Sequence, residues 1–244
     1  NDFKKNNTPI KKRASIICDK MTKISRETQK PIINLIKSHP NKYANLKSSW
    51  IINSVFVNAS IDLISIISLQ PNIKKISIQN TQADIIEYFD SNNHNMQIEN
   101  GTEPGIEAIN VRPLWEMGYT GKGKLVFNYD TGVWPQHKAF SNRFFGNLYP
   151  MNQCWDGYFS NTPNGHVSDH GTHTLGTIAG LMSETNDTIG IAFNAYWIAN
   201  DFVTSTVATL PPIEDMITSF EWALNPDGDV TTDYDVPDVI NNSW

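Results

Sequence analysis

The sequence predicts an α/β protein in which helices flank a parallel sheet, preceded by a smaller α+β domain. An apolar strand at residues 124–129 delivers Asp130-Thr131-Gly132 at its carboxyl end, where α/β sheets place functional groups. A helix is predicted at residues 168–180, where a polar pair gives way to small and apolar residues at helical spacing. The front of the chain shows a separate pattern of short strands and helices, which indicates a second domain.

Length and composition place the chain among ordinary globular proteins. Its 244 residues suffice for one large domain or two small ones with a stable core. No run of about 18 apolar residues occurs, so no membrane-spanning helix is expected. The chain begins at Asn1 without a hydrophobic signal segment, and we expect that any targeting peptide has been removed or omitted.

Two cysteines, Cys18 and Cys154, are too few for a disulfide framework and lie too far apart in sequence to imply pairing. Neither has the spacing of a zinc site or of a redox motif. We expect both to be ordinary thiols.

Charge is distributed unevenly along the chain. Residues 1–99 carry 14 Lys and Arg against 8 Asp and Glu, a balance of +6, whereas residues 100–244 carry 5 against 17, a balance of −12. The lysines of the front alternate with isoleucines and no aromatic pattern accompanies them, so no nucleic-acid partner is expected. We expect instead that the two parts attract each other.

Residues 1–13 are polar and rich in lysine, and a flexible lead-in is expected there. Residues 14–83 predict the order β-α-β-β-α-β of a small ferredoxin-like sandwich. Ser25 opens the first helix as a cap, and the last helix begins at Ala59-Ser60. The predicted elements are strands at 14–18, within 42–58 and at 73–78, and helices at 25–38 and 60–69.

Residues 84–104 form the expected linker, because their Asn-, Ser-, Gly- and Pro-rich composition is typical of connections. The second domain is predicted to occupy residues 105–244. After the helix at 168–180 it contains a strand at 195–199, a helix that begins near Pro211-Pro212, and a final strand at 239–244.

Asp130 and His170 are the candidate catalytic residues. They lie 40 residues apart, which allows one excursion and a return to the same edge of the sheet. Asp-Thr-Gly also occurs in aspartic proteases, but those need a second such triplet and this chain has none. His170 and His173 have the spacing of a metal pair, yet no nearby third ligand for zinc follows. A serine-type triad, in which the carboxylate orients the imidazole, accounts better for the pattern.

The stretch from Ser168 to Gly180 resembles the histidine motif of subtilisin-like serine proteases, the subtilases. The segment Val239-Ile240-Asn241-Asn242-Ser243-Trp244 is similar to the strand that lines the first specificity pocket of that family, closest to its bacillopeptidase-F-like members. The resemblance implies the N-terminal half of a subtilisin-like sheet, with His170 as general base and Asp130 as its orienting group. It implies that Ser243 and Trp244 border the substrate pocket and that protein or peptide substrates are cleaved.

Residues 14–83 resemble the inhibitory propeptide of subtilases, particularly from Trp50 to Ser60 and from Leu69 to Ile76. The resemblance implies a precursor, or zymogen, whose self-cleavage falls between Glu87 and Glu103. It also implies a secreted or cell-surface location.

The family's nucleophilic serine and oxyanion-binding asparagine come later in its sequence than the segment that Trp244 matches. We therefore expect both to be supplied by a segment or chain beyond residue 244, the C-terminal part of the same protease, and we expect residues 1–244 to be inactive alone. The alternative is a catalytically inactive scaffold or pseudoprotease that acts as a binding module.

No cofactor is expected to be required. Subtilases often bind calcium near residues 183–189, but Glu184, Asn186 and Asp187 lack a convincing ligand spacing. Two departures from the family pattern, at Phe193-Asn194 and Thr204-Ser205-Thr206, concern segments that in the family contact substrate.

Overall fold

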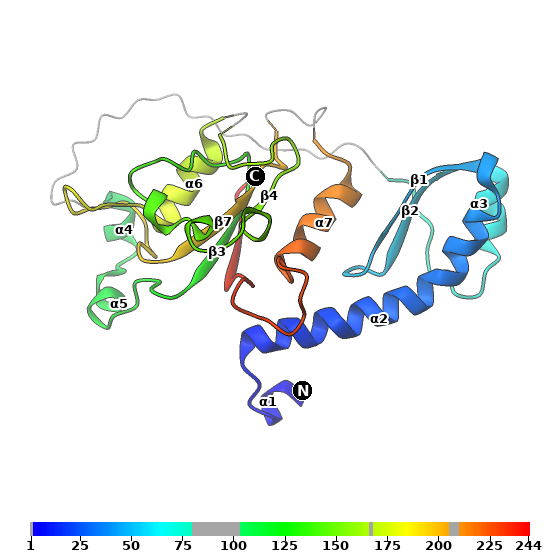
Figure 1. Cartoon of the computed structure of the whole chain (residues 1–244), viewed down its shortest axis with the longest axis horizontal. Helices are drawn as coiled ribbons and strands as arrows, with labels where there is room; N and C mark the ends of the chain where they lie inside the picture. Colours follow the sequence, from blue (N-terminus) through cyan, green and yellow to red (C-terminus); the bar gives the residue numbers. More distant parts are fainter. Residues whose placement is uncertain (1, 80–102, 166–167, 205–209) are drawn as a thin grey trace. The chain divides into compact units, whose positions relative to one another are not determined.

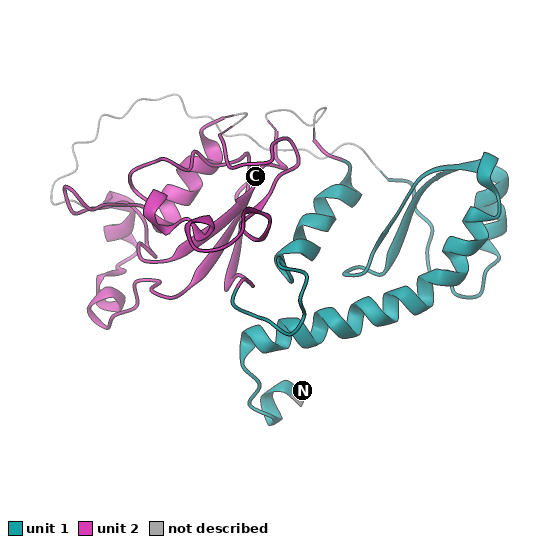
Figure 2. Ribbon diagram, viewed as in Figure 1, with its two compact units in different colours: residues 1–83, 212–234 teal, residues 84–211, 235–244 magenta. Residues whose placement is uncertain are grey.

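A computed structural model of the chain describes residues 2–79, 103–165, 168–204 and 210–244 (Figure 1). Two compact units are present, one made of Asn1–Ala83 with Pro212–Tyr234 and the other of Asp84–Pro211 with Asp235–Trp244 (Figure 2). Residues 212–234 therefore group with the front of the chain and not, as predicted, with residues 105–244. Most of the expected linker, 84–102, lies outside the described residues.

The second unit contains the predicted parallel sheet. Its four strands follow the order β4-β7-β3-β8, and every neighbouring pair is parallel. Strand β3 is buried along its whole length, as expected for a strand covered on both faces. The α/β fold class is thus confirmed. The strands are β3 (Leu125–Tyr129), β4 (Trp155–Asp156), β7 (Tyr196–Asn200) and β8 (Val239–Asn242).

Helix α6 (His170–Ala179) packs against β3 through small and apolar residues (Figure 1). Leu175 and Ala179 are fully buried on this face, and Gly171 brings the first turn close to the sheet. The excursion between β3 and α6 is fixed to β7 by Trp197, whose indole N–H donates to the carbonyl of Phe140 at 2.9 Å. The other elements of this unit are α4 (Pro104–Ala108), α5 (Arg112–Glu116), 3-10 turns at 141–143, 145–147 and 151–153, and the hairpin β5 (Leu181–Met182) and β6 (Asp187–Thr188).

The first unit has a helix-strand-strand-helix order. Helices α2 (Ile10–Lys37) and α3 (Ile61–Ser68) pack with the antiparallel pair β1 (Tyr43–Ser49) and β2 (Ser54–Ala59). Helix α3 begins where predicted, and Ser60 caps it by accepting the N–H of Leu63, whereas Ser25, the predicted cap, lies inside α2. The remaining elements are α1 (Asp2–Lys5), a 3-10 turn at 40–42 and α7 (Ile213–Ala223), and the buried core comprises Ile32, Ile36, Leu63 and Ile67.

Three expectations for the front of the chain were wrong. Residues 14–18 belong to the long helix α2 rather than to a strand, and residues 2–5 and 10–13 are helical where a flexible lead-in was expected. Residues 73–78 form no strand in the described part of the chain. The ferredoxin-like order is therefore not seen. The short apolar run at 14–18 is compatible with either structure, and only its continuity with later buried helix positions decides for a helix.

Helix α7 contacts the β1–β2 hairpin through a carboxylate. Glu221 Oε1 accepts three hydrogen bonds, from Ser49 Oγ at 2.6 Å, Trp50 N at 2.7 Å and Ile51 N at 3.1 Å. Lys47 also pairs with Asp215, in the first turn of α7. These contacts explain why residues 212–234 group with the front of the chain.

No helix among the described residues is long and apolar enough to cross a membrane. The longest, α2, has five buried positions and many charged ones.

Candidate active site

Asp130 and His170 lie next to each other in the structure. Asp130 directly follows β3, and His170 is the first residue of α6. The distance from His170 Nδ1 to Asp130 Oδ1 is 2.7 Å. The Asp130 side chain is 0% exposed and the His170 side chain is 32% exposed. One partner is therefore buried and fixed, while the other has access to solvent.

The Asp130 carboxylate is held on both oxygens. Oδ1 also accepts the N–H of Thr131 at 2.7 Å, and Oδ2 accepts the hydroxyl of Thr174 at 3.0 Å. The backbone N–H of Asp130 donates to Asn200 Oδ1, at the end of β7. A buried carboxylate with several donors remains charged at lower cost than an unpaired one, because each hydrogen bond compensates lost hydration.

The first turn of α6 is in close contact with the turn that follows β3. Gly132 has φ +98°, a conformation that favours glycine, and a Cβ at Gly171 would lie 2.1 Å from the carbonyl oxygen of Gly132. Thr131 Oγ1 accepts the N–H of Gly171 at 3.0 Å. The predicted polar cap is present only in part, because Ser168 Oγ accepts the N–H of His170 whereas Asp169 makes no side-chain cap. Together these contacts set the distance between His170 and Asp130.

Two asparagines that were not predicted, Asn128 and Asn241, form hydrogen bonds beside the Asp130–His170 pair. Asn128 Nδ2 donates to the carbonyl of Gly171 at 2.9 Å, and Asn128 Oδ1 accepts from Asn241 Nδ2 at 2.9 Å. Strand periodicity could have indicated Asn128, because Asn128 and Asp130 lie two residues apart and share a strand face. Thr174 follows His170 by four residues and so lies on the same helix face.

The other two predicted site residues lie at the same edge of the sheet. Ser243 Oγ donates to Asn241 Oδ1 at 2.9 Å. The Trp244 ring stacks on Tyr129, the residue before Asp130, with ring centroids 5.6 Å apart. Both side chains are exposed. All four predicted site residues therefore come from the carboxyl ends of β3 and β8 or from the start of α6.

Other candidate features take no part in this arrangement. His137 stacks on Phe140 in the excursion after β3. Glu184 is exposed and lies 3.8 Å from Lys138, within ion-pair distance. No group of three or more His, Cys, Asp or Glu side chains that could hold a metal was found in the described parts of the chain.

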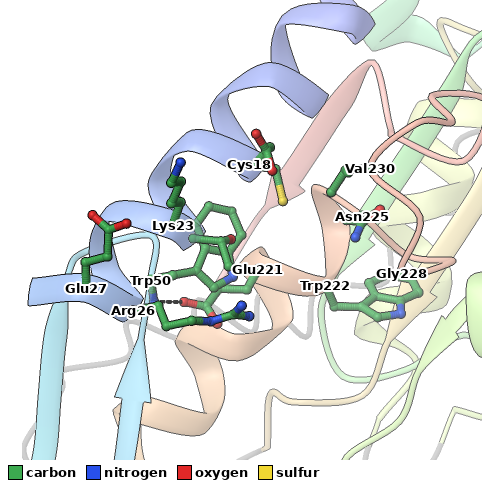
Figure 3. A pocket seen from close by; sticks show the side chains of 12 residues that line it. Cys18, Lys23, Arg26, Glu27, Trp50, Glu221, Trp222, Asn225, Gly228 and Val230 are labelled. Carbon is green, nitrogen blue, oxygen red and sulfur yellow. Dashed lines mark hydrogen bonds between the residues drawn. The ribbon is translucent and has the colours of Figure 1, made fainter. Parts of the chain in front are cut away.

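A cavity of about 760 Å³ lies in the first unit (Figure 3). It is lined by α2, the β1–β2 turn, α7 and the loop after α7, with Cys18, Trp50 and Glu221 among its side chains. Its lining mixes both signs of charge and contains no histidine. Acid–base chemistry is therefore better placed at His170 than in this cavity.

An imidazole held through Nδ1 by a buried carboxylate leaves Nε2 for proton transfer, which is how serine hydrolases orient their general base. The pair lies at the carboxyl edge of a parallel sheet, where α/β proteins place functional groups. Residues 121–244 match the family model of the subtilase family, also termed peptidase S8. The chain belongs to the subtilase family.

Individual proteases are similar to this chain. Bacillopeptidase F of Bacillus subtilis is 26% identical over 97% of this chain, furin-like protease 2 of Drosophila melanogaster 28% over 54%, and the minor extracellular protease Vpr of B. subtilis 35% over 37%. These alignments cover 17%, 8% and 11% of the relatives' own lengths. The chain thus spans less than a fifth of the proteins it matches.

Proposed function

We propose that this chain is part of a serine endopeptidase precursor, in which Asp130 and His170 form the acid–base part of a Ser-His-Asp triad. The observation that carries the proposal is the 2.7 Å contact between His170 Nδ1 and the buried Asp130 carboxylate. Membership of the subtilase family and likeness to named proteases support it.

The proposed reaction is acyl transfer to a serine supplied by a segment or chain beyond residue 244. His170 Nε2 takes the serine proton as the oxygen attacks the peptide carbonyl, and the same proton passes to the leaving amine. Water then cleaves the acyl-enzyme by the same route. Asp130 keeps Nδ1 protonated and stabilises the imidazolium, and an asparagine from the same segment or chain beyond residue 244 binds the oxyanion. No step requires a cofactor or a metal.

Residues 14–83 would act in this precursor as an inhibitory propeptide, with processing between Glu87 and Glu103. Ser243 and Trp244 would border the substrate pocket, since both lie at the edge of the sheet that carries Asp130. One relative is named as an extracellular protease, which favours secretion or a cell-surface location for this chain too.

A second candidate is a catalytically inactive subtilase scaffold that binds peptides without cleaving them. In such a protein the Asp130–His170 pair would be a structural remnant.

Labelling with a fluorophosphonate probe, which reacts with activated serines, distinguishes the two. The full-length protein should be labelled at one serine outside residues 1–244, and the His170→Ala variant should lose that labelling. A correctly folded full-length protein that is not labelled and does not hydrolyse casein would support the inactive scaffold and overturn the protease proposal.

A further inference from the structure

The N-terminal half of helix α2, the long blue helix of Figure 1, carries an apolar stripe that the fold leaves exposed. Its members recur at spacings of four, three, four and three residues, which places them on one face of the helix. They are Ile10, Ala14, Ile17, Met21 and Ile24. The three isoleucines are 78%, 44% and 38% exposed. We call these five residues the isoleucine stripe.

The isoleucine stripe is separate from the side of α2 that packs within the first unit. Between Ile10 and Ile24 only Cys18 is buried. Ser15 Oγ donates to the carbonyl of Thr232, in the loop after α7, at 3.2 Å. Because residues two apart lie on nearly opposite sides of a helix, Ile17 points away from that loop. The packing of this unit therefore does not account for the stripe.

Positive charge borders the isoleucine stripe. Arg13 lies four residues before Ile17 and Lys20 three residues after it, so both are neighbours of Ile17 on the helix surface. Over its whole length α2 carries eight Lys and Arg against two Asp and Glu, a balance of +6. An apolar stripe with a cationic border is typical of helices that lie in the surface of an anionic bilayer.

The composition of α2 favours a lipid surface over a protein partner. The stripe contains isoleucine, alanine and methionine but no aromatic anchor, and six of the eight basic residues are lysines, which protein interfaces disfavour. Lysine stems can instead cover apolar surface while their ammonium groups stay in water beside anionic headgroups. A second copy of α2 is disfavoured as well, because it would bring another balance of +6 against the first.

We propose that α2 binds the surface of an anionic lipid bilayer through the isoleucine stripe, with the helix axis parallel to the bilayer plane. The apolar side chains enter the boundary between headgroups and acyl chains, and the lysines contact lipid phosphates. The inference goes beyond the proposed protease function and does not depend on it.

The test measures cosedimentation of the full-length protein with vesicles of equimolar phosphatidylglycerol and phosphatidylcholine, and with vesicles of phosphatidylcholine alone. The protein should bind the anionic vesicles at least about tenfold more tightly, and high salt should weaken this binding. Replacing all three isoleucines, by Ile10→Gln, Ile17→Gln and Ile24→Gln, should weaken it by about tenfold or more. Glutamine is a good helix former, so α2 should persist in this triple variant.

Two matched controls separate the stripe from general effects. Ile61→Gln replaces an isoleucine of α3 in the same unit that is 81% exposed, and it should leave binding unchanged. Lys20→Glu should weaken binding to the anionic vesicles by about tenfold or more, because both a cation is lost and an anion is added beside the stripe. Lys37→Glu changes the net charge equally at the far end of α2 and should weaken binding less.

A fluorophore attached to the thiol of Ile24→Cys reports the contact directly, because its emission shifts to the blue in apolar surroundings. The shift should occur with anionic vesicles at Ile24→Cys and not at Ile61→Cys, and both native cysteines are buried. Equal binding by the parent protein and the triple variant, or no vesicle binding by the parent, would overturn the inference. A parent dimer that the triple variant loses, without vesicle binding, would overturn it in favour of a second copy.

Discussion

The imidazole of His170 and the carboxylate of Asp130 are joined at 2.7 Å although 40 residues separate them in sequence. The excursion between them ends where Gly171 meets Gly132, with no space for a side chain on either. The two residues are thus brought together because the start of α6 lies close to the end of β3.

Asp130→Asn should preserve the packing and remove the charge that orients His170. An amide can hold the ring in the wrong tautomer, so we expect kcat to fall by about 10³–10⁴-fold with KM little changed. Steady-state hydrolysis of a fluorogenic peptide by the full-length protein measures both. A loss confined to KM would show that Asp130 acts in substrate binding instead.

Gly171→Ala should destabilise the protein. The added Cβ would lie 2.1 Å from the Gly132 carbonyl oxygen and 3.1 Å from Asp130 Cβ, so the helix start must move. We expect a loss of about 1–3 kcal/mol in the free energy of unfolding, typical of overpacking, and loss of activity.

Gly176→Ala is the matched control, because it lies in the same helix with nothing within 4 Å of the added Cβ. It should raise the free energy of unfolding by up to about 1 kcal/mol, since alanine favours helices over glycine. Denaturant unfolding compares the two variants. Equal effects of both substitutions would contradict the close approach of α6 to β3.

Glu221→Ala should weaken the attachment of α7 to the β1–β2 hairpin. The substitution leaves the donors of Ser49, Trp50 and Ile51 without their acceptor, and an unsatisfied buried donor costs about 1–3 kcal/mol. Asp62→Asn removes an exposed ion pair with Lys42 and should change stability by less than about 1 kcal/mol. Thermal melting of both variants measures the difference, and a larger shift for Asp62→Asn would refute the assignment.

The two cysteines should react slowly in the folded protein. Burial, with a smaller contribution from Asp235, raises the pKa of Cys154 from 9.0 to about 12, and burial raises the pKa of Cys18. Iodoacetamide at pH 8 should label both thiols only after denaturation, because the thiolate is the reactive form. Rapid labelling of Cys154 in the native protein, detected by mass spectrometry, would show that this thiol is not buried.

The raised pKa of Cys154 also sets a direction for alkaline stability. Below pH 9 the thiol is protonated in both the folded and the unfolded chain. Between pH 9 and about 12 only the unfolded chain ionises at this residue, so its contribution to the free energy of unfolding falls as pH rises. Cys154→Ser should flatten this part of the stability profile, whereas an unchanged profile would argue against the shift.

The proximity of Asp130 and His170 and the sheet around them were predictable because their signals are local. An apolar strand that ends in Asp130 and a small-residue helix that begins at His170 each specify their own structure. The supporting residues Asn128 and Asn241 were missed because they act across strands β3 and β8, and sequence spacing gives no register between strands.

The front of the chain was predicted less well because short apolar runs do not distinguish strand from helix. Cys18 is a buried residue of α2, and the buried positions of this helix continue with Ser25, Gln29 and Ile32, at spacings of seven, four and three residues. These spacings indicate a helix, but they become visible only when the later buried positions are considered together with residues 14–18.

The most direct test of the account compares His170→Ala with His137→Ala in the full-length protein. Both remove an imidazole from the same unit, but only His170 contacts the Asp130 carboxylate. The account predicts that kcat/KM for a peptide substrate falls by at least about 10³-fold in His170→Ala and by less than about tenfold in His137→Ala. Near-parental hydrolysis by His170→Ala would contradict the central claim that this histidine is the general base.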